Sequence, residues 1–247
     1  MRKILILIAI TSLSSFAYSQ TAKEIVQKSY DKLNGKSSTS TMSMTIVRPK
    51  WTRTVTMKSW ANGTKYSMIL ITSPAKEKGQ VFLKRDREMW NWVPKIQRMI
   101  KIPPSMMMQS WMSSDFTNDD LVQQTSIVVD YTHKILREEK FYNHDCYVIE
   151  LKAKEDAAVS WGKIITWIAK GELYTLKNEY YDEDNYLINT EKLENIKLMD
   201  DRKIPTKYTI IPEEEEGNKT ILEFIETDFN AKIEESFFSQ QNMKKIR

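Results

Sequence analysis

The feature that most constrains the fold of this chain is a long succession of short segments in which apolar and polar residues alternate. Met42, Met44 and Ile46, for example, alternate with small polar residues, and turn signals such as Asn62-Gly63 separate neighbouring segments. Alternation with a period of two is typical of strands that bury one face, and short turns between such strands favour antiparallel hairpins. The segments run from Met42 to Ile100 and again from Lys134 to Ile225.

The pattern predicts a mainly β protein with a few helices, built on one antiparallel sheet of about 11–12 strands. A sheet of that size must curl rather than lie flat. We expect one domain over residues 20–247, because the composition does not change along the chain and only six glycines and seven prolines argue against long linkers.

Helices are expected near both ends of the chain. Thr21 and Glu24 form a capping box, apolar residues follow at helical spacing, and Gly35 is placed to end the helix. Residues Ile233 to Ile246 form a second amphipathic segment, and a third, short helix is expected to begin at Asn118. We expect the two terminal helices to cover the concave face of the sheet.

The first 19 residues have the features of a secretory signal peptide. Arg2 and Lys3 precede an apolar run, and Ala17-Tyr18-Ser19 places small residues at the usual cleavage positions, so cleavage is expected before Gln20. The apolar run is shorter than the roughly 20 residues that a membrane-spanning helix needs. Cys146 is the only cysteine, which leaves no disulfide within the chain and no cysteine after the cleavage point for a lipid anchor. The sequence therefore predicts a soluble periplasmic protein.

Charge argues against nucleic acid as a partner. The formal net charge is +4, two of those charges lie in the signal segment, and the remaining lysines are interspersed with acidic residues rather than gathered into a basic stripe.

The segment from Met89 to Val122 is unusual in composition, with three tryptophans, six methionines and three prolines. Pro103-Pro104 cannot continue a strand, because proline has no backbone donor and restrains the residue before it. Methionine side chains are flexible and polarizable, so such a cluster suits a cavity for a flexible apolar ligand. The simpler alternative is a methionine-rich core plug beneath a loop.

A motif runs through this segment, from a tryptophan-bearing strand over a proline turn to an acidic stretch. Its residues are Trp90, Pro94, Arg98, Pro103, Pro104, Ser105, Met106, Ser110, Trp111, Met112, Asp115, Phe116, Thr117, Asn118, Asp119, Asp120 and Leu121. This motif resembles the outer-membrane lipoprotein-sorting proteins of the LolA-like family, within the LolA/LolB superfamily. The sequence departs from the family at Ser113, where the family often has glycine.

The resemblance implies an incomplete antiparallel β-barrel with a helical lid over a hydrophobic cavity, in which acyl chains of lipoproteins or related lipids bind. An inner-membrane transporter and an outer-membrane acceptor are candidate partners, and we expect a monomer without a cofactor. Because alternation lets only one face of the strand at Met89 point inward, we expect the tryptophan face to do so. The residues expected to line or gate the cavity are Trp90, Trp92, Met106, Met107, Trp111, Met112 and Phe116.

Other polar residues of the motif have two interpretations each. Arg98 could hold the lid or contact a lipid headgroup, or it could form a routine surface ion pair. Asp115, Asp119 and Asp120 suggest a metal cluster, but they lie at an expected helix start and lack the glycine and distal glutamate of a calcium loop, so capping is the favoured interpretation. No metal is therefore expected.

A lipid hydrolase is the enzymatic alternative, and it is poorly supported. The chain has two histidines, His133 and His144, and no Gly-x-Ser-x-Gly nucleophile motif. A third class is a non-carrying partner of an inner-membrane lipid exporter, which would have a collapsed cavity. We expect a non-enzymatic carrier, or chaperone, that moves lipid or lipoprotein towards the outer membrane.

Overall fold

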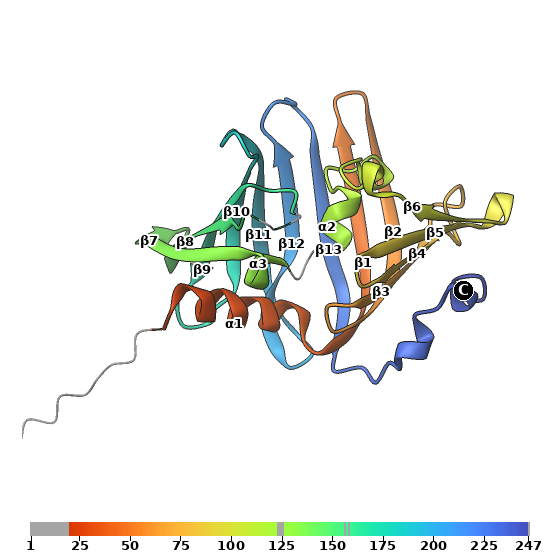
Figure 1. Ribbon diagram of the computed structural model, residues 1–247, viewed down its shortest axis with the longest axis horizontal. Helices are drawn as coiled ribbons and strands as arrows, with labels where there is room; N and C mark the ends of the chain where they lie inside the picture. The colour runs from red at the N-terminus through yellow and green to blue at the C-terminus, as the bar shows by residue number, and fades with distance from the viewer. Residues whose placement is uncertain (1–19, 123–125, 156, 158, 247) are drawn as a thin grey trace, which may run out of the picture.

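The computed structural model describes residues 20–122, 126–155, 157 and 159–246 (Figure 1). The signal segment expected at residues 1–19 lies outside the described residues. The described part of the chain forms thirteen strands in one sheet, slightly more than expected. The strands are β1 (Ser37–Arg48), β2 (Trp51–Asn62), β3 (Tyr66–Ser73), β4 (Val81–Arg85), β5 (Glu88–Val93), β6 (Arg98–Ile102), β7 (Tyr131–Phe141), β8 (His144–Ala153), β9 (Lys163–Ala169), β10 (Thr175–Tyr181), β11 (Leu187–Met199), β12 (Arg202–Pro212) and β13 (Lys219–Phe229).

The sheet consists of two meanders that meet at their long strands. β1 to β6 form one meander and β7 to β13 form the other, each with sequential antiparallel neighbours. Pairing of β1 with β13 joins them, with Ser38 opposite Phe229 and Val47 opposite Lys219. β6 and β7 remain at opposite edges of the sheet, so the barrel is incomplete, as the sequence and the resemblance predicted.

The helices are short apart from the first. They are α1 (Ala22–Asn34), α2 (Asn118–Val122), α3 (Ser126–Val129) and α4 (Gln240–Met243), with 3-10 turns η1 (Pro94–Ile96), η2 (Pro104–Met106), η3 (Trp111–Ser113) and η4 (Glu235–Phe237). The α1 capping box is present: Thr21 Oγ1 accepts from the Glu24 N–H at 3.2 Å, and Glu24 accepts from the Thr21 N–H at 2.9 Å. Gly35 ends the helix at a φ of 64°, a left-handed conformation that glycine adopts readily.

Helix α1 covers part of the concave face. Its buried residues Ile25 and Val26 pack with Ile149, Leu151 and Ile164 of β8 and β9. In Figure 1 the helix lies across the lower part of the sheet. This position confirms the expected role of the N-terminal helix and leaves the upper part of the concave face to other segments.

The connection between β6 and β7 leaves one edge of the sheet and returns at the other. It carries η2, η3, α2 and α3, and in Figure 1 it lies in front of β1 and β13. We refer to its described residues 103–122 as the lid. Trp111 of the lid is buried and packs edge-on against Phe82, with ring centroids 5.3 Å apart.

The C-terminal segment does not form the continuous helix expected over Ile233–Ile246, and it packs on the convex face rather than the concave one. It has only η4 and α4, and its Phe238 and Met243 are fully buried against Leu83 and Trp90. Apolar residues lie on both faces of β4 and β5 for this reason, since the lid covers one face and the C-terminal segment covers the other.

Among the described residues, no helix has both the length and the apolar character needed to cross a membrane.

Candidate functional site

A cavity of about 360 Å³ lies between the concave face of the sheet, helix α1 and the lid. Volumes of this order are typical of small-molecule sites. The cavity is lined by side chains from α1, the lid and strands on both sides of the β1–β13 junction. Its two walls differ in chemistry.

The first wall is mainly apolar and belongs to β1, β2, β3 and β13. Met42 and Met57 are buried there, Ile69, Leu222 and Phe224 lie beside them, and small polar residues such as Ser40 and Ser59 also line it. Trp111, Phe116 and Leu121 of the lid close over these residues. We call this set the apolar wall.

The second wall belongs to β9, β10 and β11, and it carries larger polar side chains alongside apolar ones such as Ile164 and Leu193. Strand register places Asn178 between Thr166 and Glu191, and places Tyr180 beside Asn189. All five side chains line the cavity. We call Thr166, Asn178, Tyr180, Asn189 and Glu191 the polar wall.

Glu191 is the centre of a hydrogen-bond network in the polar wall. Its Oε2 accepts from Asn178 Nδ2 and from the Tyr180 hydroxyl, both at 2.8 Å. Only 6% of Glu191 is exposed. Burial raises the pKa of this carboxyl, and the nearby Asp120 raises it further, although the two hydrogen bonds act in the opposite direction.

Asp120 brings a second buried carboxyl from the lid to the cavity. It caps α2, because its Oδ2 accepts from the Thr117 N–H at 2.8 Å while Thr117 Oγ1 accepts from the Asp120 N–H at 3.0 Å. Its Oδ1 accepts from Trp161 Nε1 at 3.2 Å. Burial raises the pKa of Asp120 despite these bonds.

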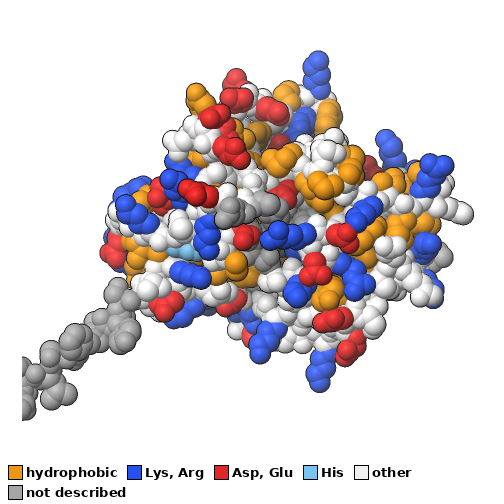
Figure 2. Space-filling view, in the orientation of Figure 1, with side chains coloured by type: hydrophobic (Ala, Val, Ile, Leu, Met, Phe, Trp, Pro, Cys, Tyr) orange, Lys and Arg blue, Asp and Glu red, His pale blue; other side chains and the backbone are white. Residues whose placement is uncertain are grey.

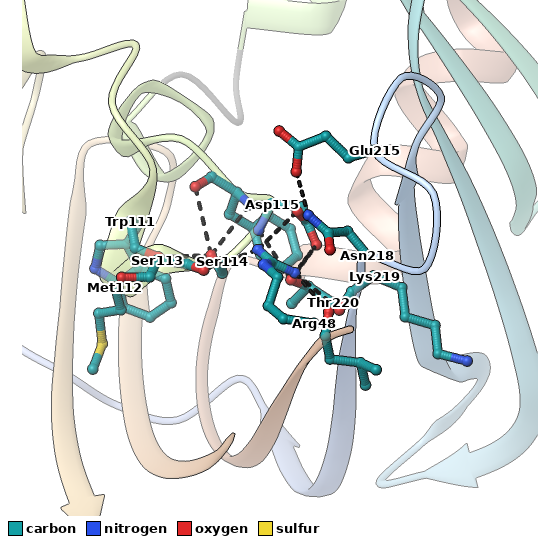
Figure 3. Close-up of polar contacts among 12 residues, drawn as sticks. Arg48, Trp111, Met112, Ser113, Ser114, Asp115, Glu215, Asn218, Lys219 and Thr220 are labelled. Atoms are coloured by element: carbon teal, nitrogen blue, oxygen red, sulfur yellow. Dashed lines mark hydrogen bonds and ion pairs between the residues drawn. The ribbon is translucent and has the colours of Figure 1, made fainter. Parts of the chain in front are cut away.

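An ion pair attaches the lid to the sheet (Figure 3). Arg48 at the end of β1 donates to both carboxylate oxygens of Asp115, at 2.9 and 3.1 Å, and also to the Ser113 carbonyl at 2.9 Å. Asp115 is further bound by the Thr220 hydroxyl of β13 at 2.6 Å. Both charged side chains are largely buried, with 14% and 6% exposed. A bidentate pair of this kind fixes orientation as well as position.

A second arginine binds the lid one strand away. Arg53 of β2 donates to the Met112 carbonyl and forms an ion pair with Glu77 at 2.9 Å. The two arginines hold consecutive lid residues, Met112 and Ser113, both of which have positive φ angles, 53° and 62°. The left-handed backbone at Ser113 is a conformation that glycine adopts more readily than serine.

Only some of the residues that were expected to line the cavity do so in the structure. Trp111 and Phe116 line it, while Met106, Met107 and Met112 pack against the same buried cluster without lining it.

The expected inward orientation of Trp90 and Trp92 differs from the structure. Met89 is the residue of β5 that packs with Trp111 on the concave side. Trp90 and Trp92 pack on the convex side with residues of the C-terminal segment. Alternation correctly put Met89 and the tryptophans on opposite faces of β5. Which face points toward the cavity depends on the C-terminal segment, which is far away in the sequence and covers the tryptophans. The prediction that these two tryptophans line the cavity is therefore corrected.

Arg98 is exposed at the start of the edge strand β6 and is not among the residues that line the cavity. Lid attachment is instead the role of Arg48 and Arg53, which the sequence analysis did not single out. Both arginines lie at the β1–β2 turn beside a tryptophan. Nothing in the local sequence, however, indicated that the lid would reach this turn.

The three aspartates of the motif have separate partners rather than a shared metal site. Asp115 binds Arg48, Asp119 accepts from the Ser160 hydroxyl, and Asp120 caps α2. Within the part of the chain that the structure describes, no group of three or more metal-ligating side chains is present. His133 is bonded to the Ile127 carbonyl at 2.7 Å, and His144 packs edge-on against Tyr174.

Comparisons with known proteins agree with this architecture. A family model described as an uncharacterized protein matches residues 63–245. A DUF1329 family protein from Desulfovibrio piger is similar in structure, with a TM-score of 0.82 and 21% identity, covering 90% of this chain and 97% of that one. No curated protein matches the chain.

Two further solved structures have the same fold. A putative outer membrane lipoprotein-sorting protein domain from Vibrio parahaemolyticus has a TM-score of 0.80 at 23% identity, covering 90% of this chain and 98% of that one. A LolA superfamily protein from Nitrosomonas europaea has a TM-score of 0.77 at 22% identity, covering 90% and 99%. These similarities confirm the LolA-like fold.

Proposed function

We propose that this chain, which belongs to the family matched over residues 63–245 and has the LolA-like fold, is a periplasmic carrier of acyl chains. In this proposal the cavity shelters the acyl chains of lipoproteins or other lipids and the protein delivers them towards the outer membrane. The signal segment expected at residues 1–19 supports the periplasm as the location. The protein acts by binding rather than by catalysis.

The observation that carries the proposal is the cavity itself, with its mainly apolar wall beneath an attached lid. Each methylene group removed from water contributes roughly 0.8 kcal/mol. An acyl chain of ordinary length could gain on the order of 10 kcal/mol before the costs of ordering the chain are subtracted. Met42 and Met57 can adapt to chains of different length, because thioether side chains rotate freely and are polarizable.

The lid attachment supports loading and release. Arg48 and Asp115 must separate if residues 111–117 are to move away from the sheet. In the proposed cycle the lid opens to admit the acyl chain and closes again through this pair. An inner-membrane transporter and an outer-membrane acceptor are the proposed donor and recipient, as in the lipoprotein-sorting role that the relative from Vibrio parahaemolyticus carries in its name.

The test is displacement of a fluorescent acyl probe, using two matched substitutions on β13. Leu222 lines the apolar wall, whereas Ile225 on the same strand is 59% exposed. Leu222→Asp places a carboxylate in the wall and should weaken probe binding at least about tenfold, which corresponds to 1.4 kcal/mol. Ile225→Asp should bind like the unmodified protein. Equal binding by all three proteins, or no binding by the unmodified protein, would contradict the proposal.

A further inference from the structure

The charged side chains that line the cavity are all acidic. They are Asp115, Asp119, Asp120 and Glu191, and no lysine, arginine or histidine of the described residues lines the cavity. The whole chain nevertheless has a net charge of +4. The acidic character of the cavity lining is therefore a local property that the net charge of the whole chain does not show.

Two of these four acids have no basic partner in the described structure. Asp115 is paired with Arg48, and Asp119 lies close enough to the buried Lys84 to affect its pKa. Asp120 and Glu191 instead accept hydrogen bonds only from neutral donors, which are Thr117, Trp161, Asn178 and Tyr180. Buried carboxyl groups are normally paired with a cation or kept neutral.

A third polar group of the same wall has no partner among the described residues. Asn189 is 8% exposed and lines the cavity, yet no described residue bonds its side-chain amide. The amide can therefore bond a group inside the cavity. Because Asn189 and Glu191 are two residues apart on β11, they point to the same face, and both neighbour the Tyr180–Asn178 pair of β10. Both described bonds to Glu191 end on Oε2, which leaves Oε1 to accept from a ligand.

We propose that the cavity selects amphiphiles that carry an ammonium group, with the acyl chain on the apolar wall and the ammonium group at the polar wall. This inference deepens the proposed carrier function and depends on it. Glu191 Oε1 and the Asn189 carbonyl oxygen accept from the ammonium group, and Asp120 of the lid supplies a second negative charge. A lipid with an anionic head would place like charges together in a buried site, so the same cavity rejects it.

Protonation gives the inference a second readout. Burial raises the pKa of both Glu191 and Asp120, so burial works against their ionised forms unless a cation pairs with them. The titratable groups that face Glu191 are Asp120 of the lid, Tyr180 of β10 and Tyr208 of β12. An arriving ammonium group favours the ionised carboxylates, and binding therefore releases protons.

The direct test compares three ligands with the same tail, namely dodecylamine, dodecanol and dodecanoate, as competitors of a fluorescent acyl probe near neutral pH. Dodecylamine should compete at least tenfold better than dodecanol, and dodecanoate should be the weakest. Calorimetry in buffers of different ionisation enthalpy should detect proton release with dodecylamine only.

Glu191→Gln keeps the size and the hydrogen-bonding shape of the side chain but removes its charge. The matched control is Glu194→Gln on the same strand, a partly exposed residue that pairs with Lys207 at 3.7 Å. Glu191→Gln should lose most of the preference for the amine and still bind dodecanol, whereas Glu194→Gln should keep the preference. Binding of dodecanol also shows that the variant is folded.

The outcomes separate the two proposals. If none of the three ligands binds, the carrier function fails. If all three bind equally, or if dodecanoate binds best, acyl binding stands and the inference about the ammonium group is overturned. Retention of the amine preference in Glu191→Gln would also overturn it.

Two natural sources of such a group can be distinguished with matched pairs. One pair is phosphatidylethanolamine and phosphatidylglycerol in mixed micelles, and the other is a diacylated lipopeptide with a free or an acetylated amino terminus. A preference for the amine-bearing member of either pair supports the inference and identifies the source. Equal competition within both pairs overturns it.

Discussion

The apolar wall and the polar wall belong to the same antiparallel sheet, but their strands fill the concave face differently. β1 and β2 place Met42 and Met57 inward, whereas β10 and β11 place Asn178, Tyr180 and Glu191 inward. A solvent-free core would be expected to be apolar throughout, because a buried polar group costs free energy unless it is bonded. The two walls match the two ends of the proposed ligand, an acyl tail and an ammonium head.

The surface gives a related contrast. In Figure 2 the orange apolar side chains gather most densely toward the upper right, while charged side chains of both signs are scattered over the rest of this face. Met108, Ile96 and Ile100, in or next to the lid, are among the exposed large apolar residues. The lid side of the molecule therefore presents exposed apolar side chains, which suit contact with an apolar surface.

The largest effect on stability is expected from removing the ion pair that attaches the lid to the sheet beside the apolar wall. Arg48→Ala leaves the Asp115 carboxylate buried without its charged partner, which should lower the free energy of unfolding by about 3–5 kcal/mol. Urea unfolding measures this change, and hydrogen exchange should show faster opening of residues 111–117. The control is Lys65→Ala, which breaks an exposed pair with Asp86 and should cost less than about 1 kcal/mol. Equal losses of unfolding free energy in the two variants would show that the buried lid pair contributes no more to stability than an exposed pair.

A smaller effect, specific to the polar wall, is expected from Glu191→Gln. The pKa of Glu191 in the folded state is raised above its ordinary value of 4.5, so the neutral acid stabilises the fold at low pH. That contribution is lost as the pH rises from about 4.5 through the raised pKa, and each unit of pKa difference is worth about 1.4 kcal/mol. Glutamine cannot ionise, so the Tm advantage of the variant should grow as the pH is raised from 4 to 8. A Tm difference that stays constant, or shrinks, across this range would contradict the burial of a poorly compensated carboxyl.

The smallest effect is expected at the lid turn. Ser113 has a φ of 62°, a conformation that costs a residue with a side chain roughly 1–2 kcal/mol and glycine almost nothing. Glycine also gains entropy in the unfolded state, so Ser113→Gly should stabilise the protein by no more than about 1 kcal/mol. Ser105→Gly in the same lid is the comparison, and it should not stabilise. A clear loss of stability in Ser113→Gly would mean that its side chain has a role beyond the turn.

Local signals were sufficient to predict most elements of the fold, but not the C-terminal segment, where only η4 and α4 form in place of the expected continuous helix. The capping box of Thr21 and Glu24, the stop at Gly35 and the alternation in β1 each depend on neighbours within a few residues. The open antiparallel sheet followed from the length of the strand series. The family resemblance added the lid, which the long connection between β6 and β7 supplies.

Other features depend on contacts between residues far apart in the sequence, so the sequence alone could not predict them. Met89 and Trp90 are both apolar, and only the position of the C-terminal segment determines which of them faces the lid. Glu191 and Asn189 lie in an ordinary strand pattern, so their burial beside Asn178 and Tyr180 depends on the pairing of β10 with β11. Asp120 was correctly interpreted as a helix cap. Its location at the cavity depends on the path of the lid, which the local sequence does not indicate.

The most direct measurement for the account is the lipid content of the protein as it is purified gently from its native host, by extraction and mass spectrometry. The account predicts acyl lipid in near-stoichiometric amount with the unmodified protein and with Ile225→Asp, and little or none with Leu222→Asp. Absence of acyl lipid from the unmodified protein, or the same amount with Leu222→Asp, would contradict the claim that this cavity holds acyl chains.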